Sequence, residues 1–384
     1  MSQFNLQSIP LSLYIHMPWC VRKCPYCDFN SHAVPDGALS VELEQQYLQA
    51  LVADFETQLL YVQGRKIHSI FIGGGTPSLI SAQGYDWLFA QLQQHVAFED
   101  GCEITLEANP GTLEHQPFAD YLSAGINRLS LGVQSFDEAH LQRLGRIHSA
   151  HNAIDAIIQA KQAGFERVNV DLMHGLPQQS IEQALLDLRL AVENGATHIS
   201  WYQLTIEPNT VFFRTQPTLP DEVVLEQIQI QGEQYLREQG FVNYEVSAWR
   251  KELPSAHNLN YWQFGDYLAI GAGAHGKVTL PEGVYRFQKT RLPKDYLAKV
   301  PAPLVNWQQI AMDDMPFEFM MNALRLNDGV PADYYTQRTG QNLASIDAIL
   351  EKLRQQKLLV ADESRLACTT KGHQYLNSVL DNFL

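Results

Sequence analysis

Three cysteines near the N-terminus are the residues whose types and spacing could do the most chemistry. Cys20, Cys24 and Cys27 fall within eight residues, in the pattern C-x3-C-x2-C. Three thiolates this close together can ligate three irons of a [4Fe–4S] cube and leave the fourth iron open to an outside ligand. A structural zinc site with His32 as its fourth ligand is the alternative, although zinc loops usually supply their ligands as two separated pairs. The spacing therefore predicts a [4Fe–4S] cluster and leaves zinc open.

Two further segments could bind a small molecule. The run Gly73-Gly74-Gly75-Thr76 can bring backbone close to a ligand because glycine has no Cβ, although such a run is also a common tight turn. Glu107 offers an acceptor to an ammonium group or a ribose hydroxyl, and it could equally be a surface carboxylate. Tyr14 precedes the cysteines on a predicted strand, where it could lean over a bound cofactor or serve as an ordinary core residue.

The motifs together resemble a known superfamily. Three segments resemble motifs of the radical S-adenosylmethionine (SAM) superfamily: Tyr26 before the third cysteine, Gly73–Pro77 and Glu107–Pro110. A second set narrows the resemblance to the oxygen-independent coproporphyrinogen oxidase group: Gly132-Val-Gln134-Ser135, Arg146 and Asp171–Pro177. The segment His257-Asn-Leu-Asn-Tyr-Trp262 resembles the HemW haem chaperones within that group. The resemblance runs from about Leu11 to the C-terminus.

The resemblance implies three cofactors or ligands: a [4Fe–4S] cluster, SAM on its open iron, and haem. The cluster would be held by the three cysteines, and His257, which we expect in a loop between two strands, would ligate the haem iron. The residues that the resemblance assigns to SAM binding are Tyr14, Tyr26, Gly74, Gly75, Thr76, Glu107, Gln134, Arg146, Asp171 and Thr205.

Two functions are consistent with a cluster and SAM, and a third reading is a zinc-stabilised barrel that only binds a partner. The first is a haem chaperone on a radical SAM scaffold, which passes haem to acceptor proteins. The second is an enzyme, a coproporphyrinogen III oxidase that performs radical oxidative decarboxylation. In the oxidases a fourth cysteine stands two positions after the third, and here that position is Phe29. Phe29 favours the chaperone, and the sequence leaves open whether SAM is cleaved.

Composition limits the partners. The chain has 27 Lys and Arg against 42 Asp and Glu, a net charge of −15, which argues against a large nucleic-acid interface. Clustered thiols suit a reducing cytoplasm, and residues 1–10 lack the pattern of a signal peptide. The expected partners are haem-acceptor proteins, among them proteins at the membrane surface, and a reductant for the cluster. The oligomeric state stays open, as does peripheral membrane association.

The candidate residues must be positioned by regular elements. Strands are expected to begin near residues 12, 69, 103, 128, 167 and 198, most of them about 30 residues apart, the repeat of a βαβ unit. The helices expected between and after them are 40–61, 85–96, 113–124, 152–163, 181–194 and 222–239. The candidates up to Thr205 cluster at the carboxyl ends of these strands, where (β/α) barrels place their working residues. The pattern predicts an α/β fold with a partial (β/α)6 barrel.

The pattern changes after residue 240. Residues 242–248 alternate as an edge strand would, and residues 267–274 suggest another strand. The remainder, from about residue 306, is expected to be helical with a hairpin at 358–368, a small winged-helix-like unit. We therefore predict a radical SAM domain at 1–300, including the His257–Trp262 segment, and a mainly helical C-terminal domain at 305–384.

Overall fold

A twelve-stranded sheet carries the fold in the computed structural model, which describes residues 4–34, 38–112 and 117–384. Six of its strands are neighbours and run parallel in chain order. They are β1 (Leu11–Met17), β4 (Ile67–Gly74), β5 (Phe98–Ala108), β6 (Arg128–Gln134), β7 (Arg167–His174) and β8 (His198–Gln203). Their order, β1-β4-β5-β6-β7-β8, confirms the partial (β/α)6 barrel.

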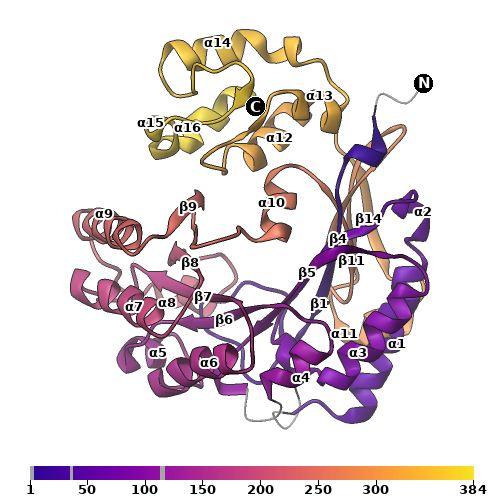
Figure 1. The fold of residues 1–384 in the computed structure, drawn as a ribbon, viewed down its shortest axis with the longest axis vertical. Helices are drawn as coiled ribbons and strands as arrows, with labels where there is room; N and C mark the ends of the chain where they lie inside the picture. Colours follow the sequence, from indigo (N-terminus) through magenta and orange to yellow (C-terminus); the bar gives the residue numbers. More distant parts are fainter. Residues whose placement is uncertain (1–3, 35–37, 113–116) are drawn as a thin grey trace.

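Helices follow the strands and cover the outer face of the barrel (Figure 1). They are α1 (Val41–Glu56), α2 (Leu59–Val62), α3 (Ala82–Gln93), α4 (Phe118–Ser123), α5 (Glu138–Arg143), α6 (Ala150–Gln162), α7 (Ile181–Glu193), α8 (Val211–Thr215) and α9 (Glu222–Glu238). Ser149 and Ser180 each form a capping box, which satisfies the first free amides of α6 and α7 and fixes where those helices begin. The first residues of the helix predicted at 113–124, 113–116, lie outside the described residues.

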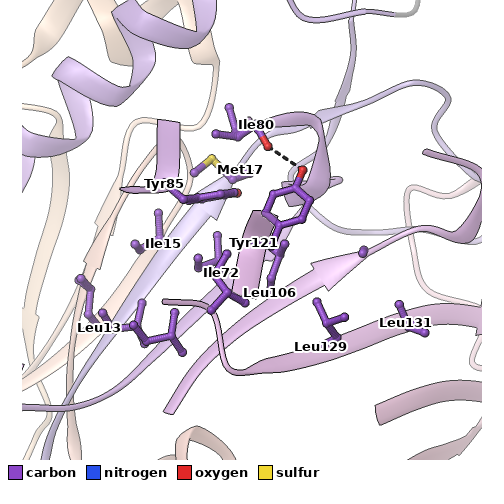
Figure 2. Close-up of a cluster of buried hydrophobic side chains, with 14 of the residues drawn as sticks. Leu13, Ile15, Met17, Ile72, Ile80, Tyr85, Leu106, Tyr121, Leu129 and Leu131 are labelled. Carbon is purple, nitrogen blue, oxygen red and sulfur yellow. Dashed lines mark hydrogen bonds between the residues drawn. The ribbon is translucent and has the colours of Figure 1, made fainter. Parts of the chain in front are cut away.

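The barrel core lies between the strands and these helices. Successive outward positions of the strands are apolar and fully buried, as Figure 2 shows for Leu13, Ile15, Ile72, Leu106, Leu129 and Leu131. Tyr121 of α4 packs with them, and its hydroxyl donates to the Ile80 carbonyl at 2.9 Å. Because side chains alternate across a strand, the intervening residues face the barrel interior, and many of these are polar.

The sheet continues beyond the barrel on both edges. On one edge β11 (Asp266–Ile270) pairs parallel with β1, and β12 (His275–Leu280), β13 (Gly283–Lys289) and β14 (Leu304–Gln309) follow antiparallel. On the other edge β8 pairs with β10 (Ala248–Arg250), which pairs with β9 (Val242–Glu245). The single strands predicted at 242–248 and 267–274 were therefore wrong in extent, and β12 to β14 were not predicted. Helix α11 (Pro293–Lys299) separates β13 from β14.

The C-terminal part is mainly helical, as predicted, and forms a second cluster of buried side chains. Its helices are α12 (Met315–Ala323), α13 (Asp333–Thr339), α14 (Asp347–Gln355), α15 (Thr370–Gln374) and α16 (Leu376–Leu380). A small ladder joins β15 (Val330–Pro331) to β16 (Arg365–Leu366), and a bridge pairs Leu359 with Cys368, where the hairpin was expected. The domain boundary that we predicted between residues 300 and 305 stays a prediction, because β14 continues the large sheet as far as Gln309. No helix within the described ranges combines the length and the apolar character that a membrane span requires.

Helix α10 (Ala256–Trp262) corrects one expectation. The segment expected in a loop is a helix capped by Ser255, whose hydroxyl accepts the Asn258 amide at 3.4 Å. This helix contacts β1, β4, β11 and α12, so it lies between the barrel and the C-terminal helices (Figure 1). Seven residues are too few to show a helical repeat in sequence, which is why the pattern was missed.

Candidate functional site

A cavity of about 400 Å³ lies at the carboxyl ends of the barrel strands, where the sequence predicts the site. It is bounded by the cysteine loop on one side and by the ends of β4 to β8 on the other. Twelve of the fourteen predicted site residues line it: Cys20, Cys24, Tyr26, Cys27, Gly74, Gly75, Thr76, Glu107, Gln134, Arg146, Asp171 and Thr205. Residues separated by up to 185 positions in sequence thus share one small volume because parallel strands bring their ends together.

All three cysteines are free thiols on the wall of this cavity. Burial raises the pKa of Cys20 and of Cys27, so a metal centre is what would hold them as thiolates. Arg146 donates towards the Cys24 sulfur at 3.7 Å, which places a positive charge beside the predicted cluster. His32, the fourth ligand of the zinc alternative, does not line the cavity. In the part of the chain that the structure describes, no group of three or more His, Cys, Asp or Glu side chains is placed so that it could hold one metal ion.

The glycine run forms a tight cradle against the cysteine loop. The Gly75 amide donates to the Met17 carbonyl at 2.6 Å, and the Thr76 amide donates to the Trp19 carbonyl at 2.7 Å. A Cβ on Gly75 would lie 2.4 Å from that Trp19 oxygen, which is backbone and cannot turn aside. Gly74 has φ of +113°, a conformation that residues with a side chain rarely adopt. Glycine is therefore required at both positions.

Two partly buried carboxyl groups line the cavity, Glu107 and Asp171. Glu107 accepts the Gly74 amide at 3.1 Å, and burial together with Asp171 raises its pKa to about 8. Asp171 accepts from the Ser130 hydroxyl at 2.9 Å and the Asn169 amide at 2.8 Å, and burial raises its pKa as well. No ion pair neutralises either carboxylate among the described side chains, so a cationic ligand would be stabilised here.

The opposite wall is formed by polar groups in constrained positions. Gln134 ends β6 with φ of +72°, and its Oε1 accepts the Tyr202 hydroxyl at 2.9 Å. Arg146 donates to Asn109 and to the Gly132 carbonyl, and its Nε is buried without a partner in the described structure. The donors and acceptors of these groups that have no protein partner could bind a ligand that has several polar atoms. The residues present therefore fit both a cluster and SAM.

Sequence reasoning missed several lining residues, among them Asn109, Ser130, Met173, Tyr202, Gln203 and Glu207. Alternation along the strands could have found Ser130, which is in phase with Gln134, and Met173, which is in phase with Asp171. Tyr14 does not line the cavity. Its hydroxyl bonds to Nδ1 of His16 at 2.7 Å, and Nε2 of His16 reaches the Asn30 carbonyl at 2.9 Å. Tyr14 thus supports the cysteine loop indirectly, through His16 and the Asn30 carbonyl.

His257 also lies away from the cavity. It is 4% exposed, stacks on Phe71 with ring centroids 4.1 Å apart, and its Nδ1 lies 2.9 Å from the Glu103 carboxylate. Glu103 precedes Glu107 by four residues on β5, or about 13 Å along the strand. Arg167 pairs with the same carboxylate at 2.6 Å. His257 is thus part of a buried polar cluster at the other end of the barrel.

Comparisons with known proteins agree with this architecture. Residues 14–191 match the radical SAM superfamily, and residues 310–375 match the HemN C-terminal domain. The structure of coproporphyrinogen III oxidase (HemN) from Escherichia coli superposes with a TM-score of 0.80 over 98% of this chain and 90% of that one, at 22% identity. The fold and these matches define a radical SAM protein with a HemN-type C-terminal domain.

Full-length relatives specify the family. Heme chaperone HemW from Haemophilus influenzae is 49% identical, and heme chaperone HemW from Escherichia coli is 47% identical, each over 98% of both chains. Radical S-adenosyl methionine domain-containing protein 1, mitochondrial, from mouse is 36% identical over 96% of this chain and 86% of its own. The chain belongs to the HemW family of the radical SAM superfamily.

Proposed function

We propose that this protein is a haem chaperone that binds a [4Fe–4S] cluster, SAM and haem, and delivers the haem to acceptor proteins. The observation that carries the proposal is a cavity lined by the three cysteines and most of the residues predicted for SAM, in which Phe29 stands where the oxidases have a fourth cysteine. Identity over the full length to relatives named haem chaperones supports the same choice.

The cysteines and the cradle would hold the cofactors. Cys20, Cys24 and Cys27 would ligate three irons, and the backbone at Gly74 and Gly75 would lie against the methionine end of SAM. Glu107 would accept from its amino group, and Arg146 would offset the charge of the thiolates. The cluster with SAM on its open iron supplies one-electron chemistry; the protein residues bind, orient and balance charge.

Phe29 lines the mouth of the cavity, and its side chain is 57% exposed. A benzyl group has no acidic or donor atom, so it cannot do what a thiol does beside a cluster. The exposed ring instead offers an apolar surface next to the cofactors. Coproporphyrinogen oxidation is therefore the less supported alternative, and we place the protein in the cytoplasm because clustered thiolates require a reducing compartment.

His257 remains our sequence-based prediction for the haem-iron ligand. In the described conformation its imidazole is enclosed by Phe71, Glu103 and Ser255. Ligation through His257 would therefore require α10 to move away from β4 and β5. Haem acceptors and the cluster reductant stay unidentified, and we propose both as partners.

The test uses the full chain, reconstituted without oxygen. Haem titration should give a saturable Soret shift, and coproporphyrinogen III with SAM and a reductant should give no protoporphyrinogen IX. Turnover of coproporphyrinogen III without stable haem binding would show that the protein is an oxidase and not a chaperone. Iron and sulfide analysis should give close to four of each per chain; stoichiometric zinc without sulfide would restore the zinc alternative.

A further inference from the structure

Polar side chains fill part of the barrel interior next to the cofactor cavity. The strand register places Ser130 of β6, Asn169 of β7 and His198 of β8 beside one another, at one level of the barrel. Asp171 follows Asn169 by two residues, so both side chains lie on the inner face of β7, and Asp171 lines the cavity. Ser130, Asn169 and His198 are all at most 7% exposed. Buried polar groups need hydrogen-bond partners, and the partners of these three lead to the cavity.

Asn169 holds the Asp171 carboxylate. Its Nδ2 donates to Asp171 Oδ1 at 2.8 Å and to the Ser130 hydroxyl oxygen at 2.7 Å, and that hydroxyl donates to Asp171 Oδ2 at 2.9 Å. Each carboxylate oxygen thus receives a donor from the barrel interior and keeps further lone pairs for a ligand. The same contacts fix the orientation of the Asn169 amide, because the reversed amide would turn its oxygen towards the carboxylate.

His198 fixes Asn169 from the other side. The Asn169 Oδ1 lies 2.6 Å from Nδ1 of His198, and it also accepts the Ser200 hydroxyl at 3.1 Å. An amide oxygen can only accept, so Nδ1 of His198 carries the proton. Burial lowers the pKa of His198 well below its ordinary value, so the ring is neutral and its Nε2 has no hydrogen.

The chain of hydrogen bonds continues beyond His198. Because Nε2 has no hydrogen, the Tyr244 hydroxyl, 3.0 Å away, donates to it, and the Tyr244 oxygen accepts the Asn258 amide of α10 at 3.2 Å. The four hydrogen bonds therefore all run one way, from α10 to the Asp171 carboxylate. Hydrogen bonds in such a chain polarise one another and stabilise a negative charge at its end. The chain thus opposes burial, which raises the pKa of Asp171.

We propose that Asn169 and His198 are positioning residues for the cofactor cavity: His198 fixes the Asn169 amide, and Asn169 holds the Asp171 carboxylate towards the ligand. Neither Asn169 nor His198 lines the cavity, so both act through Asp171. The proposal rests on the proposed function, which places SAM in this cavity, and it adds the residues that set the geometry of one wall.

Two substitutions of His198 test the proposal by equilibrium binding of SAM to the full-length, anaerobically reconstituted protein. In His198→Asn the new amide can take the place of Nδ1 and still donate to Asn169, whereas in His198→Gln the amide takes the place of Nε2 and cannot. His198→Asn should bind SAM within about twofold of the wild type. His198→Gln should bind it about tenfold more weakly at pH 7, because a hydrogen bond that supports a charged group is lost.

The pH dependence of binding separates positioning from damage to the fold. Without its donor chain Asp171 should be harder to ionise, so the affinity of His198→Gln should approach that of His198→Asn as the pH rises from 6 to 9. The other groups that act on Asp171 are Glu107 on β5, Arg128 on β6 and Tyr202 on β8. They are the same in both variants, as is the SAM amino group, so the ratio of the two affinities reports Asp171.

A second pair of variants changes tyrosines. Tyr244→Phe removes one donor of the chain and keeps the ring, so SAM affinity should fall by about threefold at pH 7. Tyr335→Phe makes the same change at a buried tyrosine of α13, whose hydroxyl donates to Gln341 at 2.6 Å, and should bind SAM as the wild type does. Circular dichroism checks that the four variants are folded. If the His198 variants are not, the comparison of Tyr244→Phe with Tyr335→Phe is the test.

The outcomes separate this inference from the function on which it rests. If the wild type binds SAM but either His198→Gln or Tyr244→Phe binds it equally well, the chain does not position Asp171. Equal losses of affinity in His198→Gln and His198→Asn at every pH would show that His198 serves packing alone, and would also overturn the inference. If the wild type binds no SAM, the proposed SAM site fails, and this inference fails with it.

Discussion

Replacement of Glu107 by Gln tests the electrostatics of the cofactor cavity. The Glu107 carboxyl is partly buried near the end of β5, and desolvation together with the neighbouring Asp171 raises its pKa to about 8. At neutral pH the group is therefore mostly protonated before a ligand binds. If SAM places its amino or sulfonium charge near Glu107, binding favours the ionised carboxylate and releases a proton.

The size of the effect follows from that pKa. With a pKa of about 8, the ionised fraction of Glu107 is about one tenth at pH 7 and about nine tenths at pH 9. SAM affinity should thus rise about tenfold over this range from Glu107 alone. The amino group of SAM also titrates near pH 8, but it does so equally in Glu107→Gln, so the ratio of wild-type to variant affinity isolates the carboxylate.

The assay is equilibrium binding of SAM to the anaerobically reconstituted protein at pH 6, 7, 8 and 9. The ratio of wild-type to Glu107→Gln affinity should increase with pH and level off near pH 9. A ratio that does not change with pH would show that Glu107 contacts only neutral atoms of SAM, such as a ribose hydroxyl, and would refute the charge argument.

Three other substitutions give independent tests. Gly75→Ala should cost about 1–3 kcal/mol of stability and abolish the SAM-induced change in the EPR spectrum of the reduced cluster. The control Gly283→Ala, whose Cβ would meet only a flexible glutamine, should leave that change intact. Equal spectra in both variants would contradict the claim that SAM lies against the backbone at Gly75. Asp266→Ala leaves two buried cations unpaired and should lower the free energy of unfolding by about 3–5 kcal/mol; a urea titration showing under about 1 kcal/mol would contradict this. His257→Ala removes a buried ring and the partner of Glu103, so it should destabilise the haem-free protein by about 2–4 kcal/mol; an unchanged thermal midpoint would refute that.

The barrel and most of its cavity could be predicted because local signals and the architecture agree there. Gly75, Glu107 and Asp171 each come at or near the end of an apolar strand, and the ends of parallel strands meet at one rim. The alternation within each strand then fixes which side chains face inwards. That is why twelve predicted residues line one cavity.

The edge strands could not be predicted because their burial depends on distant partners. Lys277 and Lys289 are 2% exposed, where a lysine in sequence indicates a solvent-facing position. Lys277 pairs with Asp266 at 3.0 Å and Lys289 pairs with Asp54 at 2.5 Å, the latter 235 residues away. The buried environment of His257 could not be predicted for a related reason, because its partner is Glu103, 154 residues earlier.

The most direct test of the central claim is haem retention by the reconstituted, full-length protein. Haem is added without oxygen, unbound haem is removed by gel filtration, and the bound haem is measured per chain, with coproporphyrinogen III supplied in a parallel sample. The chaperone account predicts about one haem per chain in a saturable complex and no protoporphyrinogen IX. Loss of all haem on the column, together with conversion of coproporphyrinogen III, would contradict it.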